Sequence, residues 1–249
     1  MTAALETTGL YRSFGALVVA DHINFRLKKG ARHALIGPNG AGKTTFINLL
    51  TGRLQPSAGQ VLLNGVDVTG DSPAARVKAG IGRTFQINAL FNELTVLDNV
   101  CLSIAERTGA SRLMFKAAYR HDEVVAEAMA LLDSLYIKDV CDRFVRDLPY
   151  GKQRLVEIAI ALGLKPAVLL LDEPAAGVPS HESHVIFDVL EQFPKEISIL
   201  FIEHDMDLVF RFAERITVLA GGATLVEGTP EEIRKNQIVR NVYLGESYG

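Results

Sequence analysis

One eight-residue segment, Gly37-Pro38-Asn39-Gly40-Ala41-Gly42-Lys43-Thr44, constrains the fold of this chain more than any other feature. It matches the phosphate-binding loop pattern G-x-x-x-x-G-K-[ST] at every fixed position. The apolar run at 34–36 precedes it and a helix-like stretch at 45–50 follows it, which is the strand–loop–helix context that such a loop needs. A glycine-rich turn without a ligand is the alternative, and the complete match argues against it.

The residue types explain how this segment would hold phosphates. Glycines let the backbone curl so that successive N–H groups face one anion, and the start of the following helix adds partial positive charge. Lys43 would reach the outer phosphates, and the Thr44 hydroxyl would ligate Mg²⁺. We therefore expect a phosphate and magnesium site at residues 37–44.

A second segment supplies carboxylates of the kind that such a site uses. The apolar run Val168–Leu171 reads as a buried strand, and Asp172 and Glu173 follow it. Asp172 would hold Mg²⁺ directly or through water, and Glu173 would orient or activate a water molecule. Buried strands often end in acidic residues, so the pattern is weak alone. The phosphate-binding loop in the same chain makes the functional reading the better one.

The order of apolar runs predicts an α/β fold. The first part reads as strands, including a hairpin that turns at Asn64-Gly65, and the middle of the chain has a helical pattern. In the last third, strands at 167–171, 197–202 and 215–219 alternate with helices, which favours a mostly parallel sheet. A capping box at Thr229 predicts the start of a final helix.

Composition limits the class of partner. The 249 residues carry a formal net charge of −3, so no strong electrostatic attraction to nucleic acid is expected. No secretory signal and no apolar stretch of bilayer-spanning length is visible. The two cysteines, Cys101 and Cys141, suit a reducing compartment in which both thiols are free. We expect a soluble chain that reaches a membrane only through a partner.

Three further segments carry a resemblance to a known family. Arg83-Thr84-Phe85-Gln86 resembles the Q-loop, 148–154 (LPYGKQR) resembles the signature, and 201–205 (FIEHD) resembles the H-loop of ATP-binding-cassette (ABC) ATPases. Together with the phosphate-binding loop and LLLDEP, the resemblance covers essentially the whole chain. RTFQ, LxYGxQR, EPAAG, IEHDM and the stretch at 242–246 are similar to the ATPase subunits of branched-chain amino-acid ABC importers.

The resemblance implies a single ABC ATPase domain over 1–249. Its parts would be a P-loop NTPase core with a mixed, mainly parallel sheet, an N-terminal antiparallel β-subdomain and an inserted α-helical subdomain. By resemblance the core with its antiparallel part takes 1–86 and 155–249. The helical subdomain, with the signature, takes 87–154, and a helical tail takes 229–249.

The resemblance also assigns roles to individual residues. ATP and Mg²⁺ would be the cofactors. The catalytic set would be Glu173, His204, Gln86 and Lys43. The metal would be held by Thr44, Gln86 and Asp172. Adenine would stack on Phe14, for which a core aromatic is the alternative. Nucleotide contacts would come from Gly37, Pro38, Asn39, Gly40, Ala41, Gly42, Lys43, Thr44 and Thr45, and, in the signature, from Tyr150, Gly151, Lys152 and Gln153.

In this family two cassettes pair head to tail around two ATP molecules, and the resemblance implies the same partners here. These are integral membrane permease subunits, a second ABC ATPase in a homo- or heterodimer, and indirectly a substrate-binding protein, with no nucleic acid. The chain would lie in the cytoplasm, on the inner face of the cell membrane. Ile87, Leu90 and Phe91 would form the surface that docks on the permease, for which local core packing is the alternative.

Three alternatives to branched-chain amino-acid import stay open at this point. The cargo could be urea, short amides or aromatic acids, because the ATPase subunit in this family does not contact cargo. A non-transport ABC ATPase usually carries two cassettes or coiled-coil insertions, neither of which is visible here. An inactive regulatory cassette is disfavoured by intact Lys43, Asp172, Glu173 and His204.

Two prolines depart from the family pattern. Pro149 stands where the signature has a small residue, often Ser, and supplies neither a hydroxyl nor an N–H donor. Phosphate contacts would then fall on the backbone N–H groups of Gly151 and Lys152 at a helix start. Pro179 replaces the usual Asp or Asn of the D-loop, which puts coupling between the two ATP sites in doubt.

Overall fold

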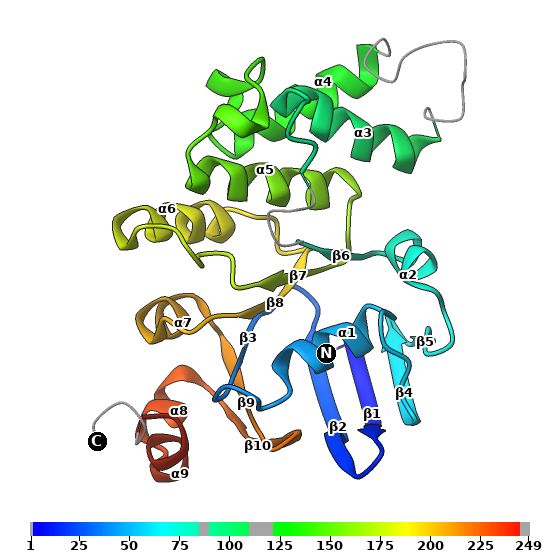
Figure 1. The fold of residues 1–249 in the computed structure, drawn as a ribbon, viewed down its shortest axis with the longest axis vertical. Coiled ribbons are helices and arrows are strands. Elements are labelled where there is room, and N and C mark those ends of the chain that lie inside the picture. The colour runs from blue at the N-terminus through cyan, green and yellow to red at the C-terminus, as the bar shows by residue number, and fades with distance from the viewer. Residues whose placement is uncertain (1, 85–89, 110–121, 245–249) are drawn as a thin grey trace.

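The computed structural model describes residues 2–84, 90–109 and 122–244, and Figure 1 shows their arrangement. An antiparallel sheet has the order β2-β1-β4-β5. Its strands are β1 (Ala3–Phe14), β2 (Leu17–Lys28), β4 (Ala58–Leu63) and β5 (Val66–Asp67). The turn between β4 and β5 has positive φ at Asn64 (49°) and Gly65 (83°), as the Asn-Gly pair predicts.

A second sheet has the order β10-β9-β3-β8-β7-β6. Its strands are β3 (Arg32–Ile36), β6 (Ile81–Arg83), β7 (Val168–Asp172), β8 (Ser198–Ile202), β9 (Arg215–Ala220) and β10 (Ala223–Gly228). Neighbouring strands are parallel except for β10, which pairs antiparallel with β9. The predicted mixed, mainly parallel sheet with a separate antiparallel sheet is confirmed.

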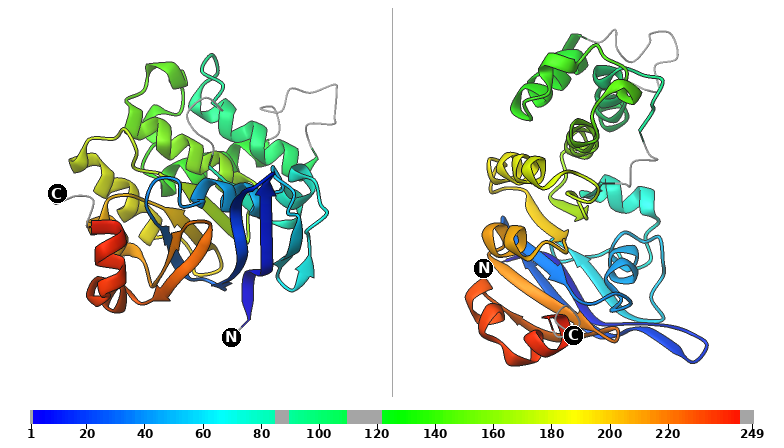
Figure 2. Two further views of the ribbon diagram at one scale, coloured as in Figure 1. Left: turned by 60° about the horizontal axis from the view of Figure 1, so that its bottom comes forward. Right: turned by 60° about the vertical axis from the view of Figure 1, so that its left-hand side comes forward.

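Helices α3, α4 and α5 gather at one end of the molecule, away from the antiparallel sheet (Figures 1 and 2). The α-helices are α1 (Lys43–Leu50), α2 (Pro73–Ala79), α3 (Val96–Thr108), α4 (Asp122–Ser134), α5 (Tyr150–Gly163), α6 (Ser180–Glu191), α7 (Met206–Phe212), α8 (Pro230–Lys235) and α9 (Gln237–Val239). Short 3₁₀ turns follow α4 at Lys138–Val140 and Val145–Asp147, and a π-turn, Arg240–Leu244, follows α9. Because α5 runs across the boundary expected between residues 154 and 155, the subdomain limits stay a proposal.

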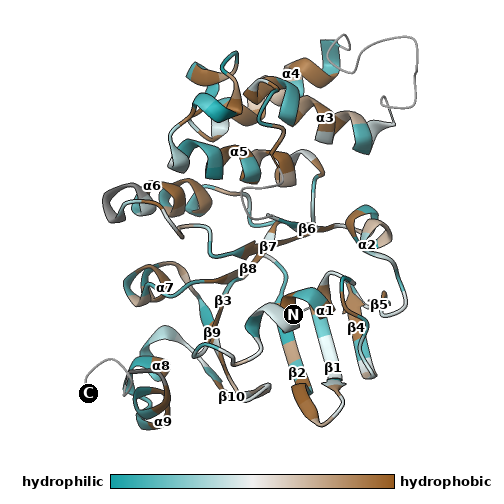
Figure 3. Ribbon diagram, in the orientation of Figure 1, coloured by the Kyte–Doolittle hydropathy of each residue, from teal (hydrophilic) through white to brown (hydrophobic). Residues whose placement is uncertain are grey.

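The central strands of the six-stranded sheet are buried on both faces, and β8 shows how one strand serves two cores. Ile199 and Phe201 belong to the core shared with α3–α7, whereas Leu200 and Ile202 belong to the core shared with α1 and the antiparallel sheet. This alternation follows from the two-residue period of a strand. Figure 3 shows the central strands as largely hydrophobic, between helices of mixed hydropathy. Each fully buried Leu, Ile or Phe stabilises the fold by about 1.5–3 kcal/mol.

Helix starts are fixed by local hydrogen bonds. Thr229 and Glu232 form the predicted capping box at α8, where Glu232 Oε2 accepts from the Thr229 N–H at 2.8 Å. The Asp205 carboxylate accepts from the N–H groups of Asp207 and Leu208 and so begins α7 directly after His204. Within the described part of the chain, no helix has the length and apolarity needed to cross a membrane.

Both cysteines are free thiols, as the sequence predicts. Cys101 is buried in the core shared with α3–α7, and burial raises the pKa of its thiol to about 11. Cys141 is partly buried, and burial raises its pKa as well. Both therefore stay protonated at neutral pH and behave as small apolar side chains.

Candidate active site

The sequence motifs converge at one edge of the six-stranded sheet. The glycine-rich loop follows β3, His204 follows β8, and Asp172 ends β7. The order β3-β8-β7-β6 makes these parallel strands neighbours. Because the carboxyl ends of parallel strands meet at one edge, segments far apart in the chain are brought together there, and such edges are where α/β proteins bind ligands.

Two glycines in the phosphate-binding loop permit close backbone approach. Gly42, the N-cap of α1, has φ +100°, and a Cβ there would lie 2.8 Å from the carbonyl oxygen of Val19. A Cβ at Gly37 would lie 2.3 Å from the carbonyl oxygen of Leu219. Any larger residue at either position would have to push backbone aside, so the loop can keep this path only with glycine.

Lys43, the first residue of α1, folds back over its own loop. Its ammonium group donates hydrogen bonds to the carbonyl oxygens of Gly37 at 2.6 Å and Pro38 at 3.1 Å. Burial lowers the pKa of Lys43, an effect that the nearby carboxylates of Glu173 and Asp172 oppose. The structure therefore places a cation between the phosphate-binding loop and both predicted carboxylates.

A cavity of about 410 Å³ joins the phosphate-binding loop, Lys43 and Glu173. It is lined by Leu17, Val18, Val19, Asn39, Gly40, Ala41, Gly42, Lys43, Thr44, Thr45, Glu173, His204, Gly221 and Gly222. The sequence analysis missed the β1–β2 hairpin residues 17–19 and the glycine pair at 221–222. The usable signal for the hairpin was two adjacent apolar residues, Leu17 and Val18, next to a glycine turn; Leu17 is 65% exposed. Exposed apolar side chains beside a phosphate site suit contact with a base or sugar.

Glu173 and His204 are in direct contact, as expected for residues that act on the same water molecule. His204 Nε2 lies 2.7 Å from Glu173 Oε1, and both side chains remain partly exposed in the cavity. Glu173 has φ +51°, a conformation that is uncommon outside glycine. Backbone strain of this kind clusters at active sites and ligand clamps. The imidazole can therefore orient the carboxylate toward a ligand bound in the cavity.

Asp172 lies where a metal-holding carboxylate is expected, and it also has a protein partner. Arg83 Nη2 donates to Asp172 Oδ2 at 2.8 Å, and Arg83 Nη1 donates to Asn48 Oδ1 at 2.9 Å. Both Arg83 and Asp172 are largely buried. The carboxylate is thus held in one orientation at the end of β7.

The signature residues lie at the start of α5, with Pro149 as an N-cap that makes no side-chain hydrogen bond. The Lys152 ammonium group lies 2.7 Å from Asp139 Oδ2. Gln153 Nε2 donates to the carbonyl oxygen of Leu148 at 3.0 Å. The charge of Lys152 is therefore partly balanced within the chain.

Tyr150 joins the signature to the D-loop of the same chain. Its hydroxyl accepts from Arg154 Nη2 at 3.0 Å, and a Cβ at Gly177 would lie 3.2 Å from its ring. Arg154 in turn forms a buried ion pair with Glu157 at 2.8 Å. The start of α5 therefore packs, through Tyr150, against the loop that follows Glu173.

The remaining predicted residues are placed as follows. Phe14 ends β1, pairs with Leu17, is 51% exposed and has the guanidinium carbon of Arg12 4.7 Å from its ring centroid. Gln86 and Ile87 lie outside the described residues. Leu90 is buried in the core, so it cannot form part of a docking surface in this conformation, whereas Phe91 is 59% exposed.

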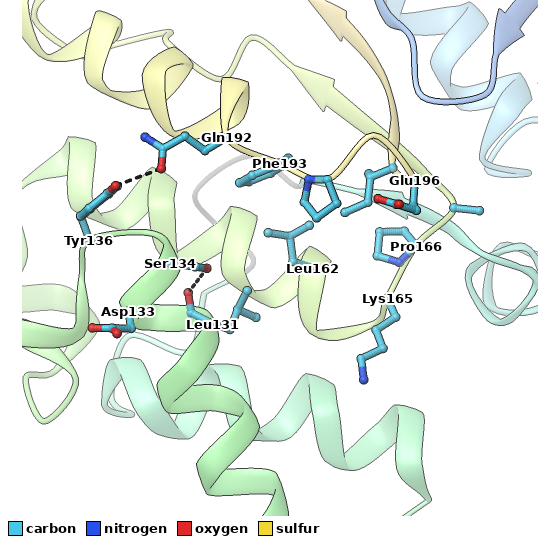
Figure 4. A pocket seen from close by; sticks show the side chains of 13 residues that line it. Leu131, Asp133, Ser134, Tyr136, Leu162, Lys165, Pro166, Gln192, Phe193 and Glu196 are labelled. Atoms are coloured by element: carbon cyan, nitrogen blue, oxygen red, sulfur yellow. Dashed lines mark hydrogen bonds between the residues drawn. The ribbon is translucent and has the colours of Figure 1, made fainter.

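A second cavity, of about 810 Å³, lies between the ends of α4 and α5 and the segment from α6 to β8 (Figure 4). Apolar side chains such as Leu131, Leu162 and Phe193 line it. Across it, the Tyr136 hydroxyl donates to Gln192 Oε1 at 2.9 Å. Residues just before β7 and β8 form one wall, so this cavity lies at the opposite end of those strands from the phosphate-binding loop.

Comparison with known families agrees with this geometry. A family model described as ABC transporter matches residues 20–176. A second, described as branched-chain amino acid ATP-binding cassette transporter, matches residues 223–249. The first covers the segment from the phosphate-binding loop to Asp172 and Glu173, and the second covers the end of the chain.

Relatives match over nearly the full length. The chain is 37% identical over 250 residues to the high-affinity branched-chain amino acid transport ATP-binding protein BraF of Pseudomonas aeruginosa, covering 98% of each chain. It is equally identical, with the same coverage, to LivG of Escherichia coli K12, which has the same description. Among solved structures, the ADP conformation of MJ1267, an ATP-binding cassette of an ABC transporter, superposes with a TM-score of 0.88 at 33% identity, covering 98% of this chain and 100% of that one.

Proposed function

Since this chain belongs to the ABC transporter ATP-binding family, in its branched-chain amino acid transport group, we propose that it hydrolyses ATP to power uptake of branched-chain or other small hydrophobic amino acids through partner permeases. The observation that carries the hydrolytic part is the 2.7 Å contact between Glu173 and His204 in the cavity that also contains Lys43 and Thr44. A nucleotide-binding protein without hydrolysis would not need this pair beside the phosphate-binding loop.

The residues fit ATP with Mg²⁺ on structural grounds. Gly37 and Gly42 lack the Cβ atoms that would collide with the carbonyl oxygens of Leu219 and Val19, so the loop keeps its path beside the cavity. Lys43 supplies a cation, whose ammonium group bonds the carbonyl oxygens of Gly37 and Pro38. Thr44 is exposed in the cavity and Asp172 ends β7 beside it. Thr44, Asp172 and Gln86 would hold the metal, which when bound neutralises charge on the phosphate oxygens.

The protein groups would act on the attacking water molecule. Glu173 accepts its proton or orients it, because its carboxylate lines the same cavity as the phosphate-binding loop. His204 holds the Glu173 carboxylate through Nε2. With ATP bound, its imidazole would contact the γ-phosphate. Lys43 balances the negative charge that gathers on the outer phosphates. Phe14 stacks on adenine, aided by its exposed position at the hairpin.

The proposal includes an assembly. Two cassettes would pair head to tail, so that Tyr150, Gly151, Lys152 and Gln153 of each chain face the ATP held by the other. The N–H groups that begin α5 would provide the phosphate contacts that Pro149 cannot. The dimer would bind permease subunits at the inner face of the cell membrane, with Phe91 in the docking surface and a substrate-binding protein delivering cargo.

The test of hydrolysis is the variant Glu173→Gln in the full chain. We expect phosphate release to fall by at least about a hundredfold while ATP binding stays within about threefold, because the amide cannot accept the proton. Glu214→Gln, an exposed acid that pairs with Lys195, serves as the matched control and should leave both unchanged. Continued phosphate release by Glu173→Gln would overturn the assignment.

The test of transport is purification of the tagged chain with its partners from native membranes in mild detergent. Two integral membrane proteins and a second cassette would support an importer with a heterodimer of ATPases. Cargo would then be tested in vesicles, with branched-chain amino acids compared against urea, short amides and aromatic acids. Recovery with ribosomes or nucleic acid and no membrane protein would contradict the transport proposal and leave the ATPase proposal standing.

A further inference from the structure

We propose that Glu203 is a positioning residue for ATP hydrolysis, because its buried carboxylate joins the turn that carries Glu173 to the loop that carries His204. This inference rests on the proposed ATPase function. Glu203 is not a member of the catalytic or nucleotide-binding set expected from the sequence, and it does not line the nucleotide cavity as described above. Its contacts are to backbone, on both sides of the pair formed by Glu173 and His204.

The backbone hydrogen bonds between β7 and β8 stop close to the catalytic side chains. β7 and β8 are parallel neighbours, and Asp172 pairs with Ile202 at the last position of their register. One more backbone hydrogen bond follows, from the Glu173 N–H to the Ile202 carbonyl oxygen at 3.1 Å. No further bond can follow from the next residue after β7, because Pro174 has no N–H to donate. The ladder therefore ends just before the catalytic side chains.

Glu203 continues the connection past that point. Its Oε1 accepts from the Ala175 N–H at 2.8 Å, and its Oε2 accepts from the His204 N–H at 3.2 Å. One carboxylate therefore bonds the backbone on both sides of the gap between the two loops. The side chain is only 4% exposed, so water does not readily take over these bonds.

The two hydrogen bonds of Glu203 hold the loops that carry Glu173 and His204. Ala175 lies two residues after Glu173, and the Ala176 N–H closes a turn onto the Glu173 carbonyl oxygen at 3.0 Å. Fixing Ala175 therefore fixes the turn in which Glu173 adopts φ +51°. Fixing the His204 N–H fixes the start of the other loop. The 2.7 Å contact between Glu173 Oε1 and His204 Nε2 depends on both loops keeping this separation.

Burying the Glu203 carboxylate costs free energy. A carboxyl group is expensive to bury, and burial raises the pKa of Glu203, as does the nearby charge of Glu173. An amide or hydroxyl side chain would satisfy one backbone N–H at a smaller cost. Only a carboxylate offers two acceptor oxygens to two donors, which is the geometry seen here. This cost is explained if the reaction requires a fixed distance between the loops that carry Glu173 and His204.

The experiment compares Glu203→Ala and Glu203→Gln with the wild-type full chain. Glu203→Ala removes both bonds, whereas Glu203→Gln keeps an oxygen for the Ala175 N–H and turns an amide donor toward the His204 N–H. We expect kcat to fall on the order of tenfold to a hundredfold for Ala and by a smaller factor for Gln, because a displacement of about 1 Å at reacting groups has effects of that size. ATP affinity should stay within about threefold in both, since the phosphate-binding loop is untouched.

Hydrogen exchange supplies a readout that is independent of catalysis. The amides of Ala175 and His204 should exchange at least about tenfold faster in Glu203→Ala, since each loses a buried acceptor. Thr217→Val is the matched control, because Thr217 is a buried β9 residue whose hydroxyl contacts His33 Nε2 at 2.8 Å, away from both loops. Thr217→Val should lower the free energy of unfolding, and any loss of kcat should be accompanied by a similar loss of ATP affinity.

The outcomes separate the two proposals. If wild-type protein binds ATP but releases no phosphate, the proposed ATPase function fails. If wild type hydrolyses ATP and Glu203→Ala keeps its kcat, the role of Glu203 is overturned. It is equally overturned if Glu203→Ala behaves like Thr217→Val, with kcat and ATP binding declining together. A selective loss of kcat, partly restored in Glu203→Gln and accompanied by faster exchange at Ala175, supports it.

Discussion

Arg83 Nη2 lies 2.8 Å from Asp172 Oδ2, so the guanidinium of one strand end holds the carboxylate of its parallel neighbour. The same guanidinium reaches Asn48 on α1, the helix that follows the phosphate-binding loop. Arg83 thereby connects three segments of the nucleotide site. Arg83 ends β6, three residues before Gln86. A displacement of the end of β6 would therefore move a direct partner of Asp172, the predicted metal ligand.

Replacing Arg83 with Met should destabilise the fold. The pair is mostly buried, with side-chain exposures of 11% and 14%, so the substitution leaves Asp172 without its partner in a poorly solvated position. We expect the free energy of unfolding to fall by about 2–3 kcal/mol in urea titrations. Lys195→Ala breaks an exposed pair of similar length, with Glu214 at 2.9 Å, and should cost less than about 1 kcal/mol. An equal loss of unfolding free energy in the two variants would show that the buried Arg83–Asp172 pair stabilises the fold no more than an exposed pair does.

Pro149→Ser should tighten ATP-driven dimerisation. Serine at this N-cap restores a side-chain hydroxyl at the start of α5, where the structure has no side-chain cap. In a Glu173→Gln background, which prevents turnover, we expect the ATP concentration needed for dimerisation to fall severalfold, measured by sedimentation. Pro149→Ala is the matched control, because alanine also removes the proline ring but supplies no hydroxyl at this N-cap. An equal gain in both variants would refute a role for the hydroxyl at the phosphates.

Motifs made of adjacent residues were predictable from the sequence. The glycine loop, Asp172, Glu173 and His204 each occupy the end of an apolar run, and parallel strands bring such ends to one edge. The mostly parallel sheet followed from the same runs, whereas the separate antiparallel sheet was expected only from the resemblance to ABC ATPases. Contacts between distant residues were not predictable, because nothing in the local pattern pairs Arg83 with Asp172 or Glu203 with Ala175.

Some polar residues were also hidden by their surroundings. His33 and Arg76 stand in stretches that read as an ordinary strand and an ordinary surface helix, yet both are buried, with exposures of 1% and 0%. Arg76 is held by donating to the carbonyl oxygens of Leu49, Leu50 and Thr69. Side chains that satisfy backbone groups at a helix end leave no periodic signal, so only the assembled fold identifies them.

His33 should make stability depend on pH. It is buried in β3, with Nε2 2.8 Å from Thr217 Oγ1, and burial lowers its pKa from 6.5 to about 4, with Glu227 opposing and Arg215 reinforcing the shift. The folded chain therefore keeps His33 neutral where the unfolded chain takes up a proton. The free energy of unfolding should fall as pH drops from 6.5 toward 4, by up to about 3 kcal/mol.

The His33 contribution can be isolated with His33→Gln. Urea titrations at several pH values between 4.5 and 7.5 give the slope for each protein. The variant lacks the titrating group, so its stability should change less over this window, whatever its absolute value. Parallel curves for wild type and variant would mean that His33 has the same pKa in the folded and unfolded chain, contrary to the expected effect of burial.

Tyr136 occupies a position that usually belongs to glycine. After α4, its N–H donates to the Asp133 carbonyl oxygen at 3.1 Å, and the Ile137 N–H donates to that of Leu132 at 3.0 Å. These two bonds form a Schellman helix end, and Tyr136 takes the left-handed conformation it requires, with φ +56°. The side chain is 64% exposed, and its hydroxyl reaches Gln192 across the second cavity (Figure 4).

This geometry predicts an order of stability among variants at Tyr136. Tyr136→Gly relieves the left-handed strain, and Tyr136→Ala keeps the strain while removing the same side chain. Glycine should therefore be more stable than alanine by about 1 kcal/mol, even though glycine usually weakens a chain through its unfolded state. Tyr136→Phe isolates the hydroxyl and should cost no more than about 1 kcal/mol, because the bond to Gln192 is exposed. Thermal unfolding of the three variants gives the order, and an alanine variant as stable as the glycine variant would show that the helix end relaxes without a left-handed residue.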